Sequence, residues 1–213
     1  MDLKQHWEAV YEKKKPTEVS WYQAEPTLSL SLVNEVAAGR AVSVIDVGGG
    51  ASTLVGRLVE RPSTKVTLLD LSGAALREAQ MGLGEKAVRV RWIEADILNA
   101  ELPAAAFDIW HDRAVFHFLT DASDRRRYVE QVRRSVRASG HVLVATFDDD
   151  GPQKCSGLDV ARYSPERLHA EFGSAFRLIR SVHETHVTPW GATQKFVYCL
   201  CSVESGNRAR RAA

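Results

Sequence analysis

Residues 44–50 read Val44-Ile45-Asp46-Val47-Gly48-Gly49-Gly50, and this stretch decides the fold of the chain. The apolar residues up to Val47 predict a buried strand, and the three glycines predict a turn whose backbone can approach a ligand closely. Residues 51–54 predict the start of a helix, which presents unpaired N–H groups. Thr53 stands where a dinucleotide-binding loop has its third glycine, and Asp46 precedes the first one. We therefore interpret the turn as a nucleotide-binding loop for a ligand that carries a cation rather than a pyrophosphate.

Length, composition and net charge indicate the general class of protein and its domain organisation. The chain has 213 residues, of which 45% are hydrophobic, and a formal net charge of +1. We expect an N-terminal lid at residues 1–30, one main domain at residues 31–204 and a disordered basic tail at residues 205–213. Because the sequence shows neither a signal peptide nor an apolar run that could span a membrane, we expect a cytoplasmic protein without a membrane partner. The near-neutral charge makes nucleic acid an unexpected partner, and the oligomeric state stays open.

The cysteines and the acidic cluster predict no metal site. Cys155, Cys199 and Cys201 are odd in number and form no C-x-x-C pair, so we expect reduced thiols rather than disulfides or a zinc site. The adjacent acids at residues 148–150 lack the alternate spacing of a calcium loop and are expected to face solvent.

Strand-like and helix-like segments alternate along the chain. Apolar runs predict strands at residues 41–47, 65–70, 88–93, 107–110 and 141–147, with helices between them. Two further β-rich stretches, residues 176–187 and 192–203, flank Pro189-Trp190-Gly191 and predict an antiparallel hairpin. This order predicts an α/β fold, in which a single open, doubly wound sheet is mostly parallel and ends in an antiparallel C-terminal hairpin. Ligands of such sheets bind at the carboxyl ends of the strands.

Three acids lie at or just after the ends of predicted strands and are expected at one edge of the sheet. Asp70 lies 24 residues after Asp46, where a carboxylate would accept hydrogen bonds from both hydroxyls of a ribose. Asp96 is placed to accept a hydrogen bond from an adenine amine. Each acid taken alone is more often a turn residue or a helix cap. Three in register favour a nucleoside ligand.

The strand-end pattern resembles that of the class I S-adenosylmethionine-dependent methyltransferases over residues 30–203. The resemblance rests on Val44-Ile45-Asp46-Val47-Gly48-Gly49-Gly50, Leu69-Asp70 and Glu94-Ala95-Asp96; Ser52 replaces a third glycine found in many members. It implies a Rossmann-like sheet of about seven strands, S-adenosylmethionine as cofactor and S-adenosylhomocysteine as product. The residues that it assigns to the cofactor are Asp46, Gly48, Gly49, Gly50, Asp70, Leu71, Asp96 and Ile97, with His111 and Trp21 expected beside them.

Two segments resemble thiopurine and related small-thiol methyltransferases. Residues 107–114 are similar to the Trp-Asp-Arg-Gly segment of those enzymes, with His111 inserted and Ala114 in place of the glycine. The N-terminal residues 6–8 and 18–22 resemble their lid, and similar segments occur in methyltransferase-like protein lysine methylases. Such a lid excludes water from a reaction in which a sulfonium loses its charge. Trp21 and Tyr22 would offer π-faces to the cation, or else simply pack on the sheet.

The catalytic candidates follow the fourth and fifth predicted strands. Asp112 is expected to orient the substrate or accept its proton, and Arg113 to hold substrate charge or form a structural pair. His117 is a candidate base, although a histidine between two phenylalanines is more often a packed residue. Cys155, beside Lys154, is expected to face the substrate as a thiolate or to be an idle loop thiol. Tyr22 of the lid completes this set.

The function that we favour is methyl transfer to a small molecule, with a thiol or another soft nucleophile as acceptor. The short chain leaves no separate domain for a macromolecular substrate, although a protein lysine methyltransferase remains an alternative. An NAD-dependent oxidoreductase fits less well, because no tyrosine has a lysine four residues later. A non-catalytic cofactor-binding module is the third alternative. DNA amine methylation is disfavoured, because His111-Asp112-Arg113 stands where such enzymes carry two prolines.

Overall fold

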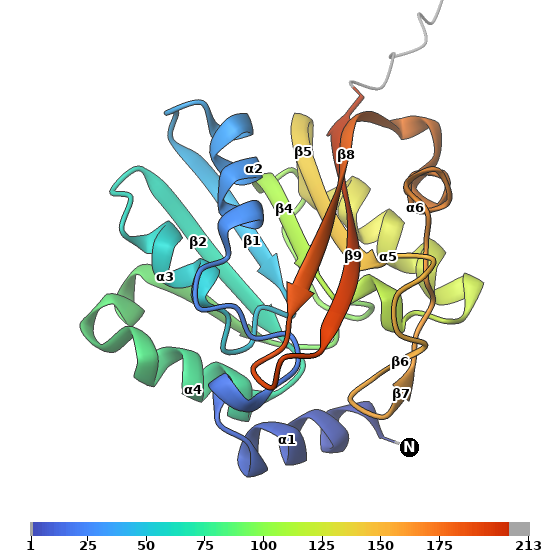
Figure 1. Ribbon diagram of the computed structural model, residues 1–213. Coiled ribbons are helices and arrows are strands. Elements are labelled where there is room, and N and C mark those ends of the chain that lie inside the picture. Colours follow the sequence, from blue (N-terminus) through green and yellow to red (C-terminus); the bar gives the residue numbers. More distant parts are fainter. Residues whose placement is uncertain (1, 205–213) are drawn as a thin grey trace, which may run out of the picture.

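One seven-stranded sheet organises the chain, in the order β3-β2-β1-β4-β5-β9-β8 (Figure 1). The computed structural model describes residues 2–204, and the basic tail predicted at residues 205–213 lies outside the described residues. The strands are β1 (Val42–Val47), β2 (Thr64–Asp70), β3 (Val90–Glu94), β4 (Phe107–Arg113), β5 (Val136–Phe147), β8 (Phe176–Val187) and β9 (Thr193–Val203). The first five are parallel, and β9 is antiparallel to both β5 and β8. The predicted fold class is therefore confirmed.

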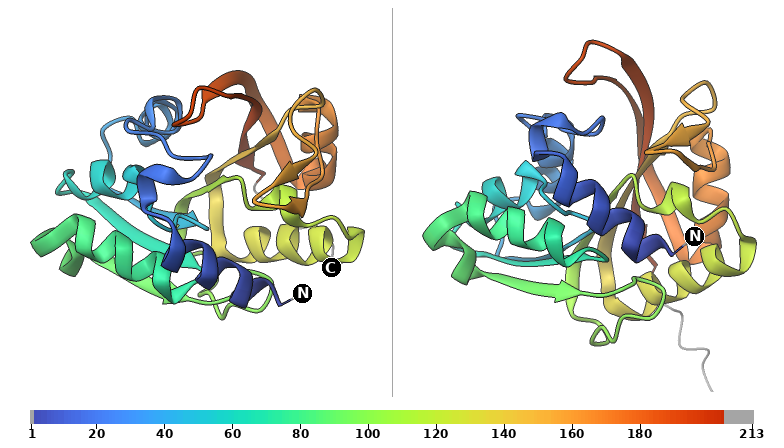
Figure 2. Two further views of the ribbon diagram at one scale, coloured as in Figure 1. Left: turned by 60° about the horizontal axis from the view of Figure 1, so that its bottom comes forward. Right: turned by 90° about the horizontal axis from the view of Figure 1, so that it is seen from below.

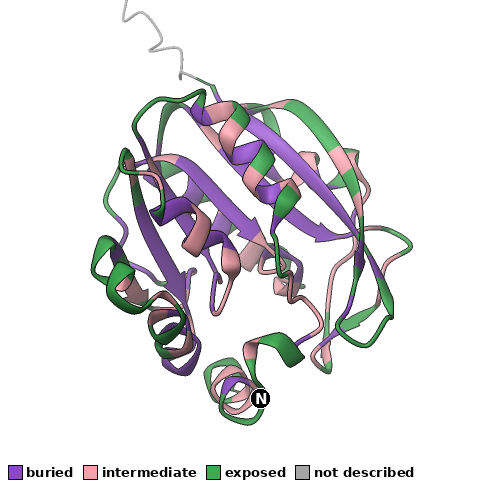
Figure 3. Cartoon of the chain, turned by 60° about the vertical axis from the view of Figure 1, so that its left-hand side comes forward, coloured by how far each residue is buried: buried purple, intermediate pink, exposed green. Residues whose placement is uncertain are grey.

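Helices cover both faces of the sheet. They are α1 (Leu3–Lys13), α2 (Thr27–Ala37), α3 (Thr53–Val59), α4 (Gly73–Leu83), α5 (Ala122–Ser135) and α6 (Pro165–Phe172). Apolar side chains of α2, α3 and α4 pack on one face, and those of α5 and α6 pack on the other. The central strands are consequently buried on both sides, as Figure 3 shows in purple.

The side chains of β4 alternate between the two faces of the sheet, and this alternation decides which of them can contact one another. Ile109 packs in the apolar cluster on the α2–α3 face, whereas Trp110 packs in the cluster on the α5–α6 face. Because successive side chains of a strand point to opposite faces, His111 and Arg113 lie on the side of Ile109, and Asp112 lies on the side of Trp110.

The strand ends align at one edge of the sheet. Val47 of β1 lies beside both Leu69 of β2 and Asp112 of β4 in register. Polar serines begin the helices that follow: the Ser52 hydroxyl accepts a hydrogen bond from the Leu54 N–H at 3.1 Å, and Ser72 caps α4. The edge predicted to carry the site is therefore formed by aligned strand ends and helix starts.

The N-terminal segment crosses this edge. Figure 2 shows α1 lying across the carboxyl ends of the strands, followed by the strap, which we define as residues 14–26 and which includes the short helical turn η1 (Pro16–Glu18). Glu8 of α1 accepts hydrogen bonds from the N–H groups of Gly73 and Ala74 at the start of α4, at 2.7 and 3.0 Å. This arrangement places residues 2–26 over the site.

Two details differ from the sequence prediction. β5 begins at Val136 rather than at residue 141, because Val136 pairs with Phe107 across an irregular register. Residues 137–139 are exposed, so they lack the apolar signal of a strand. The segment that follows β5 contains a short hairpin, β6 (Lys154–Cys155) with β7 (Leu158–Asp159), which the predicted strands do not include. The remaining short turns are η2 (Gly84–Arg89), η3 (Phe116–Phe118) and η4 (Gly173–Ala175).

Within residues 2–204, no helix has both the length and the apolar character that a membrane crossing would need.

Candidate functional site

The glycine turn after β1 is packed so closely that side chains are excluded from it. Gly48 has a φ of +63°, and a Cβ atom there would overlap the side chain of Val115. Gly50 has a φ of +43°, and a Cβ atom there would lie 2.6 Å from the Tyr11 hydroxyl. Both the backbone conformation and the lack of space therefore require glycine.

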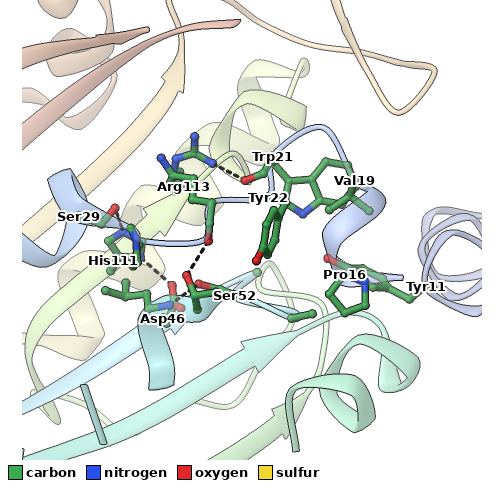
Figure 4. Close-up of a pocket in the computed structure, with 17 residues that line it drawn as sticks. Tyr11, Pro16, Val19, Trp21, Tyr22, Ser29, Asp46, Ser52, His111 and Arg113 are labelled. Atoms are coloured by element: carbon green, nitrogen blue, oxygen red, sulfur yellow. Dashed lines mark hydrogen bonds and ion pairs between the residues drawn. The ribbon is translucent and has the colours of Figure 1, made fainter. Parts of the chain in front are cut away.

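Asp46 is buried at the base of this turn with one oxygen free. His111 Nδ1 lies 2.6 Å from Asp46 Oδ1, and His111 Nε2 lies 2.9 Å from the Ser29 hydroxyl of α2 (Figure 4). Asp46 Oδ2 has no hydrogen-bond partner among the described residues and faces Gly49. A buried carboxylate oxygen without a donor is unfavourable by itself, so this atom suits a ligand that donates a hydrogen bond.

Asp70 and Asp96 both lie beyond the ends of neighbouring strands. Asp70 accepts a hydrogen bond from the Ser72 N–H at 2.8 Å and another from the Gly50 N–H, while burial raises its pKa to about 7. Asp96 accepts hydrogen bonds from the Leu98 N–H and the Asn99 amide, both at 2.9 Å. Each acid therefore shapes its own turn and also borders a cavity.

Two cavities meet beneath α1 and the strap. The first has a volume of about 50 Å³ and is lined by the glycine turn, Asp46, His111, Ser29 and the strap residue Tyr22 (Figure 4). The second has a volume of about 130 Å³ and lies between the strand ends, α1 and η3. Both are lined by Tyr11, Trp21, Gly48 and Arg113, so they form one elongated site.

Most of the residues predicted for the cofactor line this site. The first cavity contains Asp46, Gly48, Gly49, Trp21 and His111, and the second contains Gly48, Asp70, Leu71, Asp96, Ile97 and Trp21. Gly50 lies behind them and contributes its N–H to Asp70. Of the catalytic candidates, Tyr22 lines the first cavity, Cys155 the second, and Arg113 both.

Asp112 does not reach either cavity, which corrects its predicted role. It is fully buried on the opposite face of β4, where the Tyr128 hydroxyl donates to it at 2.5 Å. The N–H groups of Val115 and Phe116 also donate to it, at 2.9 and 3.1 Å. Burial raises its pKa to about 6. Asp112 therefore holds the turn from β4 into η3 rather than a substrate.

His117 is likewise a packed residue rather than a base. Its ring is fully buried, with centroids 4.4 Å from Phe118 and 4.7 Å from Phe147. Neither ring nitrogen has a hydrogen-bond partner among the described residues, and burial lowers its pKa to about 3. His117 lines neither cavity of the site, so the packing alternative is the correct one.

Cys155 borders the site as a thiol. Burial raises its pKa to about 12, and the Lys154 ammonium, which the sequence suggested as an activator, is exposed and pairs with Asp159 at 3.3 Å. Of the two alternatives for Cys155, its burial and the pairing of Lys154 favour the thiol over the thiolate. Cys155 contributes an apolar surface to the second cavity.

Arg113 ties the strap to the C-terminal hairpin. It donates to the Trp21 carbonyl at 3.1 Å and to the Tyr198 hydroxyl at 2.8 Å, and it pairs with Glu184 at 3.3 Å. Its guanidinium also lies 4.2 Å from the centre of the Phe196 ring. The structural-pairing alternative therefore describes its contacts, and its charge is already compensated within the protein.

Several residues of the site give no local sequence signal. Ser29 and Tyr11 reach the glycine turn from helices that lie outside the strand-end pattern, and Glu184 comes from β8. The acids at residues 148–150 each have a basic partner, namely His183, Arg167 and Lys195. Among residues 2–204, no group of three His, Cys, Asp or Glu side chains is arranged to hold a metal ion.

Comparison with known proteins agrees with this architecture. Residues 44–140 match the family described as a methyltransferase domain. An uncharacterized methyltransferase of Mycobacterium tuberculosis is 36% identical over 104 residues, which cover 49% of this chain and 50% of the relative. The chain thus matches about half the length of this curated relative.

Solved structures share the whole fold at low identity. The N-methyltransferase NodS from Bradyrhizobium japonicum, in complex with S-adenosylhomocysteine, has a TM-score of 0.71 at 15% identity, covering 93% of this chain and 98% of that one. The 1,6-didemethyltoxoflavin-N1-methyltransferase of Burkholderia thailandensis has a TM-score of 0.73 at 18% identity, and the match covers 95% of this chain and 88% of that one. These matches do not confirm the narrower resemblance to thiopurine methyltransferases. Residues 44–140, which include the glycine turn, thus match a methyltransferase domain, and the seven-stranded sheet shares its fold with the solved N-methyltransferases.

Proposed function

We propose that this chain binds S-adenosylmethionine in the elongated site and transfers its methyl group to a small molecule. The observation that carries the proposal is Asp46, a buried carboxylate in which one oxygen has no partner among residues 2–204, beside a turn that only glycine fits. An oxygen of this kind suits the ammonium of the methionine part. The family match covers residues 44–140, and the proposal extends methyltransferase activity to the whole chain.

The strand-end residues fit the remaining parts of the cofactor. Asp70 would accept hydrogen bonds from the ribose hydroxyls, and Leu71 beside it would contact the sugar. Asp96 and Ile97 would hold the adenine, because a carboxylate accepts from the amine and an apolar side chain packs on the ring. All four residues line the second cavity.

The bound cofactor supplies an electrophilic methyl carbon: a lone pair of the acceptor bonds to this carbon while sulfur keeps the electron pair of the broken bond. The contribution of the protein is to orient the reactants and exclude water. The strap supports both roles, because Tyr22 and Trp21 line the site and Arg113 holds the Trp21 carbonyl. Their aromatic rings would also favour a cation.

The charges around the second cavity favour a neutral, soft acceptor. The Arg113 charge is balanced by Glu184, and Cys155 is a protonated thiol. Asp70 and Asp96, which also line this cavity, are assigned to the cofactor, so a charged acceptor would compete for groups that are already engaged. His117 and Asp112 are out of reach as bases, so an acceptor such as a thiol, whose own proton is easily lost, fits best. The Burkholderia relative, whose structure contains 1,6-didemethyltoxoflavin, gives a precedent for a small molecule on this fold.

Calorimetry with S-adenosylmethionine, S-adenosylhomocysteine and NAD tests cofactor binding. We expect the first two to bind and NAD not to bind; binding of NAD alone would contradict the proposal. A labelled-methyl assay with small thiols, amines, carboxylates and a protein extract then tests the acceptor. Transfer only to protein lysine would contradict the small-molecule part, and tight cofactor binding without any transfer would favour a non-catalytic module.

A further inference from the structure

Asp46 depends on a single protein partner. Only 2% of its surface is exposed, and its one hydrogen bond within the described residues comes from His111 Nδ1. Asp112, by contrast, accepts hydrogen bonds from three donors on the other face of β4. The orientation of Asp46 is therefore set by the orientation of His111.

His111 is itself fixed at both ring nitrogens. An ionised Asp46 can only accept, so the hydrogen bond between them requires a proton on Nδ1. In the neutral ring Nε2 then accepts from the Ser29 hydroxyl at 2.9 Å. His111 and Ser29 are 3% and 1% exposed, so water does not compete for these bonds.

The line of polar contacts continues to the strap. Ser29 also interacts with the Tyr198 hydroxyl, which donates to Glu184 at 2.9 Å. Glu184 in turn accepts a hydrogen bond from the strap residue Gln23 at 3.0 Å. Ser29 therefore has a second polar neighbour besides His111.

We propose that His111 and Ser29 are positioning residues that hold Asp46 so that its Oδ2 faces the ammonium of the cofactor. The inference rests on the proposed function and deepens it. Neither residue needs to touch the nucleoside part. Their effect should therefore be confined to ligands that carry the amino-acid end.

Two ligands separate this role from a structural one. S-adenosylhomocysteine carries the amino-acid end, whereas 5′-methylthioadenosine has the nucleoside and the thioether without it. We expect His111→Leu to weaken S-adenosylhomocysteine binding by at least about tenfold and to change 5′-methylthioadenosine binding less than threefold. His111→Asn, whose amide can donate from the position of Nδ1, should recover most of the lost affinity. Ser29→Ala should produce a smaller loss of the same kind.

A matched serine and a double variant complete the test. Ser135 is fully buried and its hydroxyl has no partner among the described residues, so Ser135→Ala should leave both ligands unaffected. In an Asp46→Asn background, His111→Leu should add little further loss. The ¹⁵N shifts of the His111 ring should show a proton on Nδ1.

Three results would overturn the inference: equal weakening of both ligands, additive losses in the double variant, or an unprotonated Nδ1. These differ from failure of the proposed function, in which the unmodified protein would bind neither ligand.

Discussion

The Tyr128 hydroxyl donates a hydrogen bond to Asp112 Oδ2 at 2.5 Å and accepts one from Trp110 Nε1 at 2.9 Å. All three side chains are fully buried, on the face of β4 that is turned away from the cavities. Polar groups in such surroundings stabilise the fold only while each keeps its partner. Asp112 should therefore affect folding more than chemistry.

The first prediction concerns this buried hydrogen bond. Tyr128→Phe should lower the free energy of unfolding by about 1–3 kcal/mol, because it leaves an acceptor on Asp112 and a donor on Trp110 unpaired. Tyr163→Phe is a matched control, since the Tyr163 hydroxyl is buried and has no partner among the described residues. Chemical denaturation measures both.

Asp112→Asn should also destabilise the protein, because an amide can accept fewer hydrogen bonds than a carboxylate. The folded variant should retain S-adenosylhomocysteine binding. Loss of turnover at unchanged stability would instead restore the catalytic role that the sequence suggested for Asp112.

The second prediction is a pH dependence set by Asp70. Burial raises its pKa to about 7, so between pH 4 and 7 the folded protein binds more protons here than the unfolded chain does. The contribution of Asp70 to the stability of the unliganded protein should therefore fall as pH rises toward 7. Asp112, with its pKa raised to about 6, contributes the same trend at lower pH. Burial lowers the pKa of His117 to about 3, which gives the opposite trend near the ordinary histidine pKa. The difference in slope between the unmodified protein and Asp70→Asn, measured by denaturation between pH 6 and 7.5, therefore isolates Asp70.

Cofactor binding should show the opposite trend. Ribose hydroxyls donate to the ionised carboxylate, so binding below pH 7 requires Asp70 to lose its proton. Affinity for S-adenosylhomocysteine should fall by about tenfold per pH unit below the pKa, and calorimetry should record proton release. An affinity that stays constant from pH 5.5 to 8 would contradict the ribose role of Asp70.

The third prediction separates backbone strain from steric exclusion at the glycine turn. Gly48 and Gly39 have similar φ angles, +63° and +74°, but only a Cβ atom at Gly48 would meet a side chain, that of Val115. Gly39→Ala should cost about 1 kcal/mol of stability through conformation alone. Gly48→Ala should cost more and should also weaken cofactor binding. Adding Val115→Ala should recover part of both losses, and no recovery would show that φ alone requires Gly48.

Sequence patterns were sufficient for the fold because the central strands are buried on both faces. Such strands appear as mostly apolar runs, as in β1, and β1, β2 and β4 carry Asp46, Asp70 and Asp112 near their carboxyl ends, at the same edge. The same property explains the error at Asp112. With both faces apolar, nothing in residues 107–113 indicates which side chains face the cavities, and Asp112 and Arg113 necessarily point opposite ways.

Local sequence patterns also could not indicate which residues support the site from distant parts of the chain. Ser29 lies 82 residues from His111 in sequence, and its position depends on how α2 packs on the sheet. The pKa of the Cys155 thiol is raised by burial, and the neighbouring Lys154 does not lower it because its ammonium pairs with Asp159. Such features follow from tertiary contacts and have no periodic signature in the chain.

The last prediction concerns the hydrogen bonds by which Glu8 joins α1 to the start of α4. The Glu8 carboxylate accepts hydrogen bonds from the first N–H groups of α4, at Gly73 and Ala74, and carries its charge at the positive end of that helix. These bonds fasten α1 beside Asp70, where the ribose would lie. Because Trp7 and Tyr11 on the same helix line the second cavity, release of α1 would open the site.

Glu8→Ala should therefore lower stability by about 1 kcal/mol and increase hydrogen exchange in α1 before the rest of the protein. Dissociation of S-adenosylhomocysteine, followed by stopped-flow fluorescence, should become faster. Glu12→Ala is the control, since Glu12 is exposed on the same helix and has the same charge. If both variants accelerate dissociation equally, the effect comes from the net charge of α1. If only Glu8→Ala accelerates dissociation, the hydrogen bonds from Glu8 to α4 are what keep α1 over the site.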